Sequence, residues 1–302
     1  MTAISSINPG LILILGALPA LLLPLVIRRL YILALPIVGF MLVHQLEPGT
    51  LVTMEAFGMT LEPLQVDRLS LVWGYIFNIA AFLGLLFAWH ERDILQQVSA
   101  LVYAGAAIAA VFAGDLVTLF VFWELTGVSS VFLIWASRTP EAYRCGMRYL
   151  VIQVTSGVIL LAGAIIWYAD TGSIDFGHIG IDSIAGKLIL VAFGIKCAFP
   201  LLHNWLQDAY PQATVTGTVI LSAFTTKLAV YALARGFAGT EALIYIGATM
   251  TAFPIFYAVI ENDLRRVLAY SLNNQLGFMV VGVGVGTELA LNGTAAHAFS
   301  HI

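Results

Sequence analysis

Charged residues are scarce in this sequence: Asp, Glu, Lys and Arg make up 10% of its 302 residues, whereas 60% are apolar and the mean hydropathy is +0.95. Soluble domains carry about 25% charged residues, because water must be satisfied over their whole surface. This shortage excludes a water-soluble globular domain. The small net charge of −4 also leaves no basic surface for nucleic acid. Lipid is therefore the expected solvent of the chain.

Cysteines and cofactor motifs are scarce as well. Cys145 and Cys197 have neither CxxC nor metal-ligand spacing, so no disulfide is expected. No nucleotide-, haem- or cluster-binding motif occurs in the sequence, which predicts a protein without a cofactor. The N-terminal stretch lacks the basic region of a cleaved signal peptide, and we interpret it as the first membrane span, retained in the mature protein.

Long apolar runs predict an all-α fold, a polytopic transmembrane helical bundle of about ten to eleven helices. A helix needs about 20 mostly apolar residues to cross the hydrocarbon core, and only closed structures cross it with every backbone group paired. The expected spans cover residues 11–27, 30–46, 69–89, 95–113, 116–136, 149–168, 188–207, 214–235, 243–260 and 267–287. A further span begins near residue 289.

The connections between spans predict a hairpin and an orientation. Two connections are long, 47–68 and 169–187, and β-prone residues around Gly58 predict a short hairpin within 51–64 on the membrane surface. Basic residues favour the cytoplasmic side. Loops after odd-numbered spans hold Arg28, Arg29, Arg92, Arg138, Arg144, Arg148, Arg265 and Arg266, whereas loops after even-numbered spans hold only Arg68, Lys187 and Arg235. This bias predicts an extracytoplasmic N-terminus, and we expect a multi-pass protein of the inner (plasma) membrane.

Three ionisable residues fall inside predicted spans: Glu124, Lys196 and Lys227. A charge near the bilayer centre costs at least about 2.5–3.5 kcal/mol on insertion scales. Low-dielectric surroundings favour the neutral form of such groups and a nearby opposite charge favours the charged form, so a buried Glu–Lys pair lies close to a change of protonation. We interpret the three residues as a proton path. A static ion pair, or polar contacts that hold helices together, is the alternative.

Further polar features accompany these charges. Pro200 follows Lys196 by four residues and removes a backbone hydrogen bond, which predicts a kink or break in that helix. Hydroxyls able to hold water or to bond back to their own helix line the span of Lys227; they are Thr214, Thr216, Thr218, Ser222, Thr225 and Thr226. His297 and His301 share a helical face at i, i+4, but no acidic residue completes a metal motif. Because histidine titrates near neutral pH, we expect both to extend the proton path.

Six segments follow one another from about Val66 to the end of the chain. They are VDRLSLVW, DLVTLFVFWELTGVSS, GIKCAFPLLHNWLQDAYPQAT, TTKLAVYALAR, ENDLRRVLAYSLNNQLGFM and HAFSH. In this order they resemble the antiporter-like membrane subunits of Mrp-type cation/proton antiporters, respiratory complex I and membrane-bound hydrogenases. The segment AYPQATVTGTVILSAFTTK is most similar to D-type Mrp subunits, whereas complex I relatives usually carry a histidine at the position of Leu221.

The resemblance implies roles for the buried charges. Glu124 matches the family's glutamate that pairs with the lysine of the broken helix, here Lys196, and Lys227 matches the lysine that passes protons onward. The family's fold of two inverted five-helix repeats implies three parts. They are N-terminal helices in 1–94 (about three) with an extracytoplasmic loop 47–68, a complete first repeat in 95–236 with its broken helix near Pro200, and an incomplete second repeat in 237–302. A further lysine or glutamate would follow HAFSH, so we expect a C-terminally truncated sequence.

Three functions remain open at this point. The first is a subunit of a multi-subunit antiporter that exchanges protons for a monovalent cation, Na⁺, with other membrane subunits as partners and no enzymatic chemistry of its own. The second is a proton-pumping membrane subunit of an NADH–quinone oxidoreductase or related redox complex, in which partner subunits hold the chemistry. The third is a self-contained solute transporter with a broken-helix binding site. The ordered segments favour the first two over the third.

Overall fold

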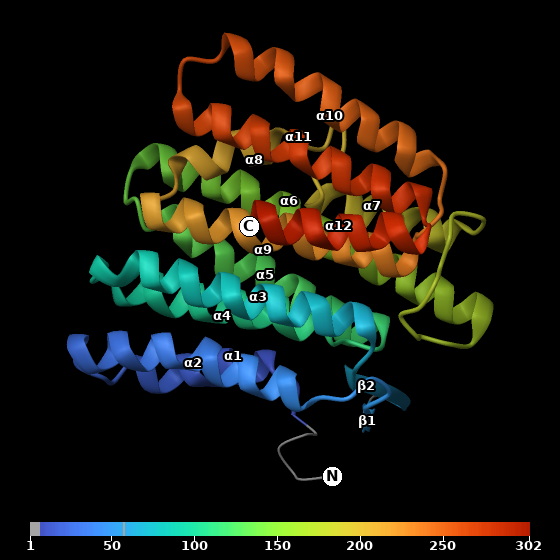
Figure 1. Cartoon of the computed structure of the whole chain (residues 1–302), viewed down its shortest axis with the longest axis horizontal. Coiled ribbons are helices and arrows are strands. Elements are labelled where there is room, and N and C mark those ends of the chain that lie inside the picture. The colour runs from blue at the N-terminus through green and yellow to red at the C-terminus, as the bar shows by residue number, and fades with distance from the viewer. Residues whose placement is uncertain (1–6, 57) are drawn as a thin grey trace.

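The computed structural model describes residues 7–56 and 58–302, and within them the chain forms twelve α-helices and one two-stranded sheet (Figure 1). The first six helices are α1 (Gly10–Ala20), α2 (Leu25–Gln45), α3 (Arg68–Phe87), α4 (Ile94–Val111), α5 (Leu116–Trp135) and α6 (Pro140–Thr171). The other six are α7 (Ile184–Lys196), α8 (Asn204–Ala209), α9 (Val215–Gly236), α10 (Ala242–Ile260), α11 (Leu264–Val285) and α12 (Glu288–His301). The strands are β1 (Leu51–Ala56) and β2 (Met59–Gln65).

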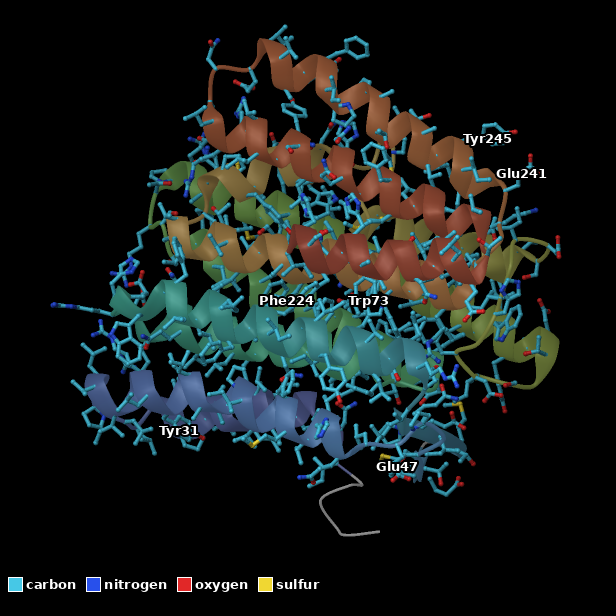
Figure 2. All side chains as sticks on the ribbon, in the orientation of Figure 1. Tyr31, Glu47, Trp73, Phe224, Glu241 and Tyr245 are labelled. Atoms are coloured by element: carbon cyan, nitrogen blue, oxygen red, sulfur yellow. The ribbon has the colours of Figure 1, made fainter. Side chains whose placement is uncertain are left out.

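The helices stack in layers, with most of their axes running the same way (Figure 1). Helices α1 and α2 form one edge, α3 and α4 lie next to them, α10 and α11 form the opposite edge, and α5 to α9 lie between. Figure 2 places Trp73 and Phe224 in the middle of this stack and Tyr31, Glu47, Glu241 and Tyr245 at its periphery. Glu124, Lys196 and Lys227 belong to α5, α7 and α9, which lie in these middle layers.

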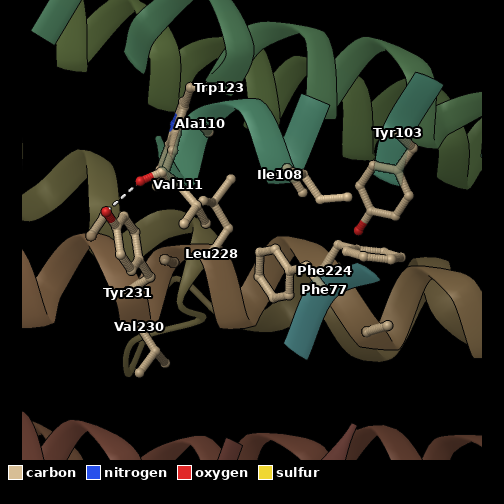
Figure 3. Close-up of a cluster of buried hydrophobic side chains, with 14 of the residues drawn as sticks. Phe77, Tyr103, Ile108, Ala110, Val111, Trp123, Phe224, Leu228, Val230 and Tyr231 are labelled. Carbon is tan, nitrogen blue, oxygen red and sulfur yellow. Dashed lines mark hydrogen bonds between the residues drawn. The ribbon is translucent and has the colours of Figure 1, made fainter. Parts of the chain in front are cut away.

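Aromatic side chains join the layers around α9. The Phe224 ring meets Phe77 of α3 and Tyr103 of α4 edge-on, at centroid distances of 5.4 and 5.3 Å (Figure 3). The Tyr231 hydroxyl donates to the Val111 carbonyl at the end of α4 (Figure 3). Edge-to-face pairs of this kind stabilise packing beyond their buried area. They hold α9, the helix that carries Lys227, against α3 and α4.

The all-α membrane fold predicted from the sequence is confirmed. Seven of the described helices are long and apolar enough to cross a membrane: α2, α3 with its 3₁₀ extension, α4, α5, α6, α9 and α10. Each predicted span overlaps a helix, although 11–27 extends from α1 into α2 and 188–207 is divided between α7 and α8. The grouping of helices into two repeats stays a prediction.

The C-terminal end of the first predicted span was wrong. It was expected to run from 11 to 27, but α1 ends at Ala20, and α2 begins at Leu25 directly after Pro24. Pro24 is extended, with ψ of 153°, so the chain turns between the two helices. Arg28 and Arg29 therefore lie in α2 and not in a loop. Their guanidinium groups reach carbonyls of the connection between α3 and α4.

The span expected at 149–168 is also longer than predicted, because α6 begins at Pro140. The Thr139 hydroxyl accepts from the Ala142 amide, and proline at the first helical position is well suited to a helix start. Hydropathy misses the first turns because Arg144 and Arg148 are polar, although both are helical. A membrane helix need not end where its apolar stretch ends.

The predicted hairpin is confirmed as β1 and β2, which pair antiparallel around Gly58. Gly58 has a φ of 74°, a left-handed conformation that glycine adopts without strain. The Glu62 amide donates to the Asp115 carboxylate at 2.7 Å, so the hairpin is bonded to the start of α5. Burial, together with repulsion from Asp175 and Asp115, raises the pKa of Glu62. Glu62 is therefore protonated more readily at this site than it would be in water.

Arg235, at the end of α9, joins three segments at the hairpin end of the bundle. Its guanidinium binds the Asp67 carboxylate, the Gln65 amide oxygen at 3.0 Å and the Tyr231 hydroxyl at 3.0 Å. The side chain of Arg235 is 8% exposed and that of Asp67 is 44% exposed. The end of α9 is thereby bonded to the residues that begin α3.

Arg235→Met should lower the stability of the protein by about 1.5–3 kcal/mol, since hydrogen bonds to charged groups contribute that much. Arg138→Met is the matched control, because the Arg138–Asp93 pair is 77% exposed on the arginine side. Exposed pairs contribute about 0–1 kcal/mol. The thermal midpoints of the two detergent-solubilised variants check this. Equal midpoints would mean that the Arg235 contacts contribute no more than a surface pair.

Candidate functional site

Helix α5 carries Glu124 to the middle of the bundle. Its N-cap is Asp115, whose carboxylate accepts from the Val117 and Thr118 amides at 2.8 and 2.7 Å. A capping carboxylate at this end also meets the positive end of the helix dipole. Glu124 lies nine residues beyond the cap, about 14 Å along the axis at 1.5 Å per residue. That distance is about half of the hydrocarbon thickness.

The helix break predicted beside Pro200 is confirmed. Helix α7 ends at Lys196, and the Phe199 amide donates back to the Gly194 carbonyl at 2.9 Å across Ala198, which has a φ of 60°. This is a Schellman-type helix end, normally made with glycine at the left-handed position. A Cβ on Gly194 would collide with the Phe199 ring, so glycine is needed there. Pro200 cannot extend the helix, because it has no N–H and would clash one turn back.

Lys196 is fully buried at this break. Its ammonium donates to the Trp123 carbonyl and to the Thr126 hydroxyl, the latter at 2.8 Å, both on α5. It also lies 4.5 Å from the centroid of the Trp123 ring, a cation–π distance. The lysine therefore contacts the residue directly before Glu124.

Glu124 itself projects from α5 toward α6. A Cβ on Gly157 of α6 would overlap the Glu124 carboxylate, so the carboxylate occupies the notch that this glycine leaves. Its Oε1 atom is buried and has no hydrogen-bond partner among the described residues. The five ion pairs within 4.0 Å in the described part of the chain do not include Glu124 with Lys196. The structure brings the two residues to the interface of α5, α6 and α7, which we call the seam, without a direct bond between them.

Lys227 is 1% exposed in the middle of α9. Its ammonium bends back along the helix and donates to the Ser222 carbonyl at 2.8 Å. Several hydroxyls of this helix have partners of their own: Thr225 meets the Tyr103 hydroxyl at 2.6 Å, and Thr218 donates to the Tyr210 carbonyl. These contacts favour packing as the role of those two threonines.

The two histidines lie beyond Lys227 on α12. Ser222 and His301 both line a cavity of about 410 Å³ between α9, α11 and α12. His297 bonds the Gln275 amide oxygen at 2.8 Å and stacks on His301 at a centroid distance of 6.3 Å. Within residues 7–56 and 58–302, no three His, Cys, Asp or Glu side chains converge as a metal site would require. Lys227 does not itself line this cavity, but its ammonium bonds the carbonyl of Ser222, which does.

Two residues of the seam were missed by the sequence analysis. Gln153 of α6 is fully buried, and neither its Oε1 nor its Nε2 has a hydrogen-bond partner in the described structure. Gly157, one turn further, makes room for Glu124. A lone amide in the apolar stretch YLVIQVTSGVIL, with glycine four residues later, was the available signal.

Sequence comparison shows which known proteins this chain is similar to. Residues 113–302 match the family described as "NADH:quinone oxidoreductase/Mrp antiporter, TM". The chain is 30% identical over 213 residues to the D-type subunit of the Na(+)/H(+) antiporter of Alkalihalophilus pseudofirmus, covering 64% of this chain and 43% of that protein. It is 28% identical over 259 residues to NAD(P)H-quinone oxidoreductase chain 4 1 of a Synechococcus species, covering 79% and 49%. The chain spans about half the length of these curated relatives.

Solved structures share the fold. A chain of the Mrp complex from Dietzia sp. superposes with a TM-score of 0.82 at 22% identity, over 100% of this chain and 62% of that one. A chain of the membrane-bound sulfane sulfur reductase, an archaeal respiratory membrane complex, gives 0.84 at 22% identity, over 97% and 54%. These likenesses establish the antiporter-like arrangement of the helices.

Proposed function

The chain belongs to the NADH:quinone oxidoreductase/Mrp antiporter transmembrane family, and on that premise we propose that it is a subunit of a multi-subunit antiporter that exchanges protons for Na⁺. The observation that carries this proposal is the burial of two lysines, Lys196 at 0% and Lys227 at 1% exposure, inside a membrane bundle. Buried ionisable groups in membranes mark ion and proton paths more often than structural contacts.

In this proposal Glu124 and Lys196 change protonation together. Lys196 lies at a helix break, where its ammonium is bonded to the Trp123 carbonyl and the Thr126 hydroxyl instead of to a carboxylate. The ammonium can therefore give up its proton without breaking a direct ion pair. Lys227 receives the proton next. Its ammonium bonds the Ser222 carbonyl, and the cavity that Ser222 lines extends to His301 of α12, on which His297 stacks.

The alternative is a proton-pumping subunit of an NADH–quinone oxidoreductase, and the 28% identical quinone oxidoreductase chain supports it. The proton path would be the same, but partner subunits would hold the redox chemistry. Leu221, buried on α9 at a position where complex I relatives usually have histidine, favours the antiporter. Purification of the assembled complex separates the two proposals: iron–sulfur subunits in it would overturn the antiporter assignment.

Partners, membrane and orientation belong to the same proposal. We place the chain in the inner (plasma) membrane among other membrane subunits, with its N-terminus extracytoplasmic. The guanidinium groups of Arg28 and Arg29 bond to carbonyls near Arg92, which gathers three basic residues at one end of the bundle. Such a cluster favours the cytoplasmic side. Labelling of single cysteines introduced at Glu91 and at Thr60, from either side of the membrane, tests the orientation.

Glu124→Gln should abolish cation-dependent proton movement by the full complex, at least about 100-fold, because a positioned proton-transfer group contributes that much or more. Glutamine keeps the size of the side chain in the Gly157 notch and removes its titration. Glu141→Gln is the control, since Glu141 is exposed at the start of α6. Dissipation of ΔpH in membrane vesicles measures both. Normal activity of an assembled Glu124→Gln complex would exclude the proposed role.

A further inference from the structure

The facing sides of α5 and α6 interlock through two glycines. A Cβ on Gly127 of α5 would lie 3.1 Å from the Cβ of Gln153 on α6, and a Cβ on Gly157 of α6 would overlap Glu124 of α5. Positions 153 and 157 lie one turn apart on one face of α6, as 124 and 127 do on α5. Gln153 and Glu124 therefore project into the same seam from opposite helices, one turn apart.

Lys196 enters this seam from the third helix, α7. Its Nζ atom lies 4.0 Å from the position of a Cβ on Gly127, the residue whose missing side chain accommodates Gln153. The carboxylate, the amide and the ammonium are thus gathered within about one helical turn, from α5, α6 and α7. The hydroxyl of Tyr149, one turn before Gln153 on α6, is hydrogen-bonded to the Ser130 hydroxyl at 2.8 Å.

The polar atoms of the seam are only partly satisfied. Among residues 7–56 and 58–302, the fully buried Gln153 has no hydrogen-bond partner for either amide atom, and the buried Glu124 Oε1 atom has none either. Buried polar groups in folded proteins nearly always have partners in some populated arrangement. A primary amide matches these neighbours in chemistry, because its NH₂ donates to a carboxylate and its oxygen accepts from an ammonium.

We propose that Gln153 is a positioning residue that bridges Glu124 and Lys196, a role that rests on the function proposed above. In the bridged arrangement Nε2 donates to the Glu124 carboxylate and Oε1 accepts from the Lys196 ammonium, so the amide stabilises the charged pair. In the arrangement of this structure Lys196 is bonded to Trp123 and Thr126, and the bridge is open. No proton passes through the amide; it sets how strongly the pair holds its charges.

Two substitutions at Gln153 test the bridge in the full complex through the pH dependence of proton movement. Gln153→Met keeps the volume but removes the acceptor, so the alkaline limb of the profile should move to lower pH by about one unit. Gln153→Glu adds a carboxylate beside Lys196, so the same limb should move to higher pH by about one unit. We expect the maximal rate to fall about tenfold in both variants, because Gln153→Met loses both halves of the bridge and Gln153→Glu loses the donor half.

Asn78→Leu is the matched control. Among the residues that the structure describes, the buried amide of Asn78 on α3 has no partner for its oxygen, and its nitrogen donates to the Gly74 carbonyl of its own helix. This variant should leave the pH profile in place. Opposite shifts from the two Gln153 variants support the bridge, because a purely structural defect would lower the rate without moving the profile in two directions. Unshifted profiles alongside an inactive Glu124→Gln complex would overturn the bridge alone. An active Glu124→Gln complex would overturn the proposed function and the bridge with it.

Discussion

Replacing Lys196 with methionine is expected to abolish cation-dependent proton movement while leaving the protein at least as stable. The loss should reach about 100-fold or more, the contribution of a positioned proton-transfer group. Stability should not fall, because Lys196 is fully buried and no described carboxylate lies within 4.0 Å of its ammonium, which makes it costly to the fold, whereas methionine is not. Residues that serve function at the expense of stability commonly behave in this way.

Lys187→Met provides the control for this experiment. Lys187 lies in the first turn of the same helix, α7, and is exposed. It should tolerate methionine without loss of proton movement. Vesicle ΔpH assays and thermal midpoints of the purified complex give the two readouts. A Lys196→Met complex that is inactive but strongly destabilised would mean that the lysine holds the break together, as in a static polar contact between helices.

The buried charges were found from the sequence because insertion of a charge into an apolar run is costly. Each of Glu124, Lys196 and Lys227 interrupts a long hydrophobic stretch that carries no other charge, so hydropathy alone separates them from loop residues. The break at α7 was predictable for a similarly local reason, the missing N–H of Pro200. The sequence is therefore sufficient to identify the buried charged residues and the helix break, because both depend on local chemistry.

The arrangement of the seam was not predictable in the same way. The sequence predicted that Glu124 and Lys196 act as a pair, but not that Glu124 points to Gly157 while Lys196 bonds to the backbone of α5. Which helices face each other, and with which residues, follows from packing across three helices and not from spacing along one. Gln153 was missed because an uncharged amide carries no insertion cost large enough to stand out from the packing residues around it.

The second large effect is expected at Lys227, where arginine should be as damaging as alanine. Lys227 lies twelve residues into α9, about 18 Å along the axis, and within the described part of the chain its ammonium bonds the Ser222 carbonyl alone. A relay must release its proton, and arginine does not deprotonate in proteins. Lys227→Arg and Lys227→Ala should therefore both reduce proton movement by about 100-fold or more.

Comparison of these two variants distinguishes a relay from a fixed positive charge. A fixed charge that only holds α9 against its neighbours would be kept by arginine, so Lys227→Arg would retain most of the activity and Lys227→Ala would lose it. A relay loses both. Lys187→Arg, at an exposed position, controls for the exchange itself. The rate of proton movement at saturating cation, measured on assembled complexes, decides between a relay and a fixed charge. Activity in Lys227→Arg would remove Lys227 from the proton path and leave Lys196 as the last lysine of that path.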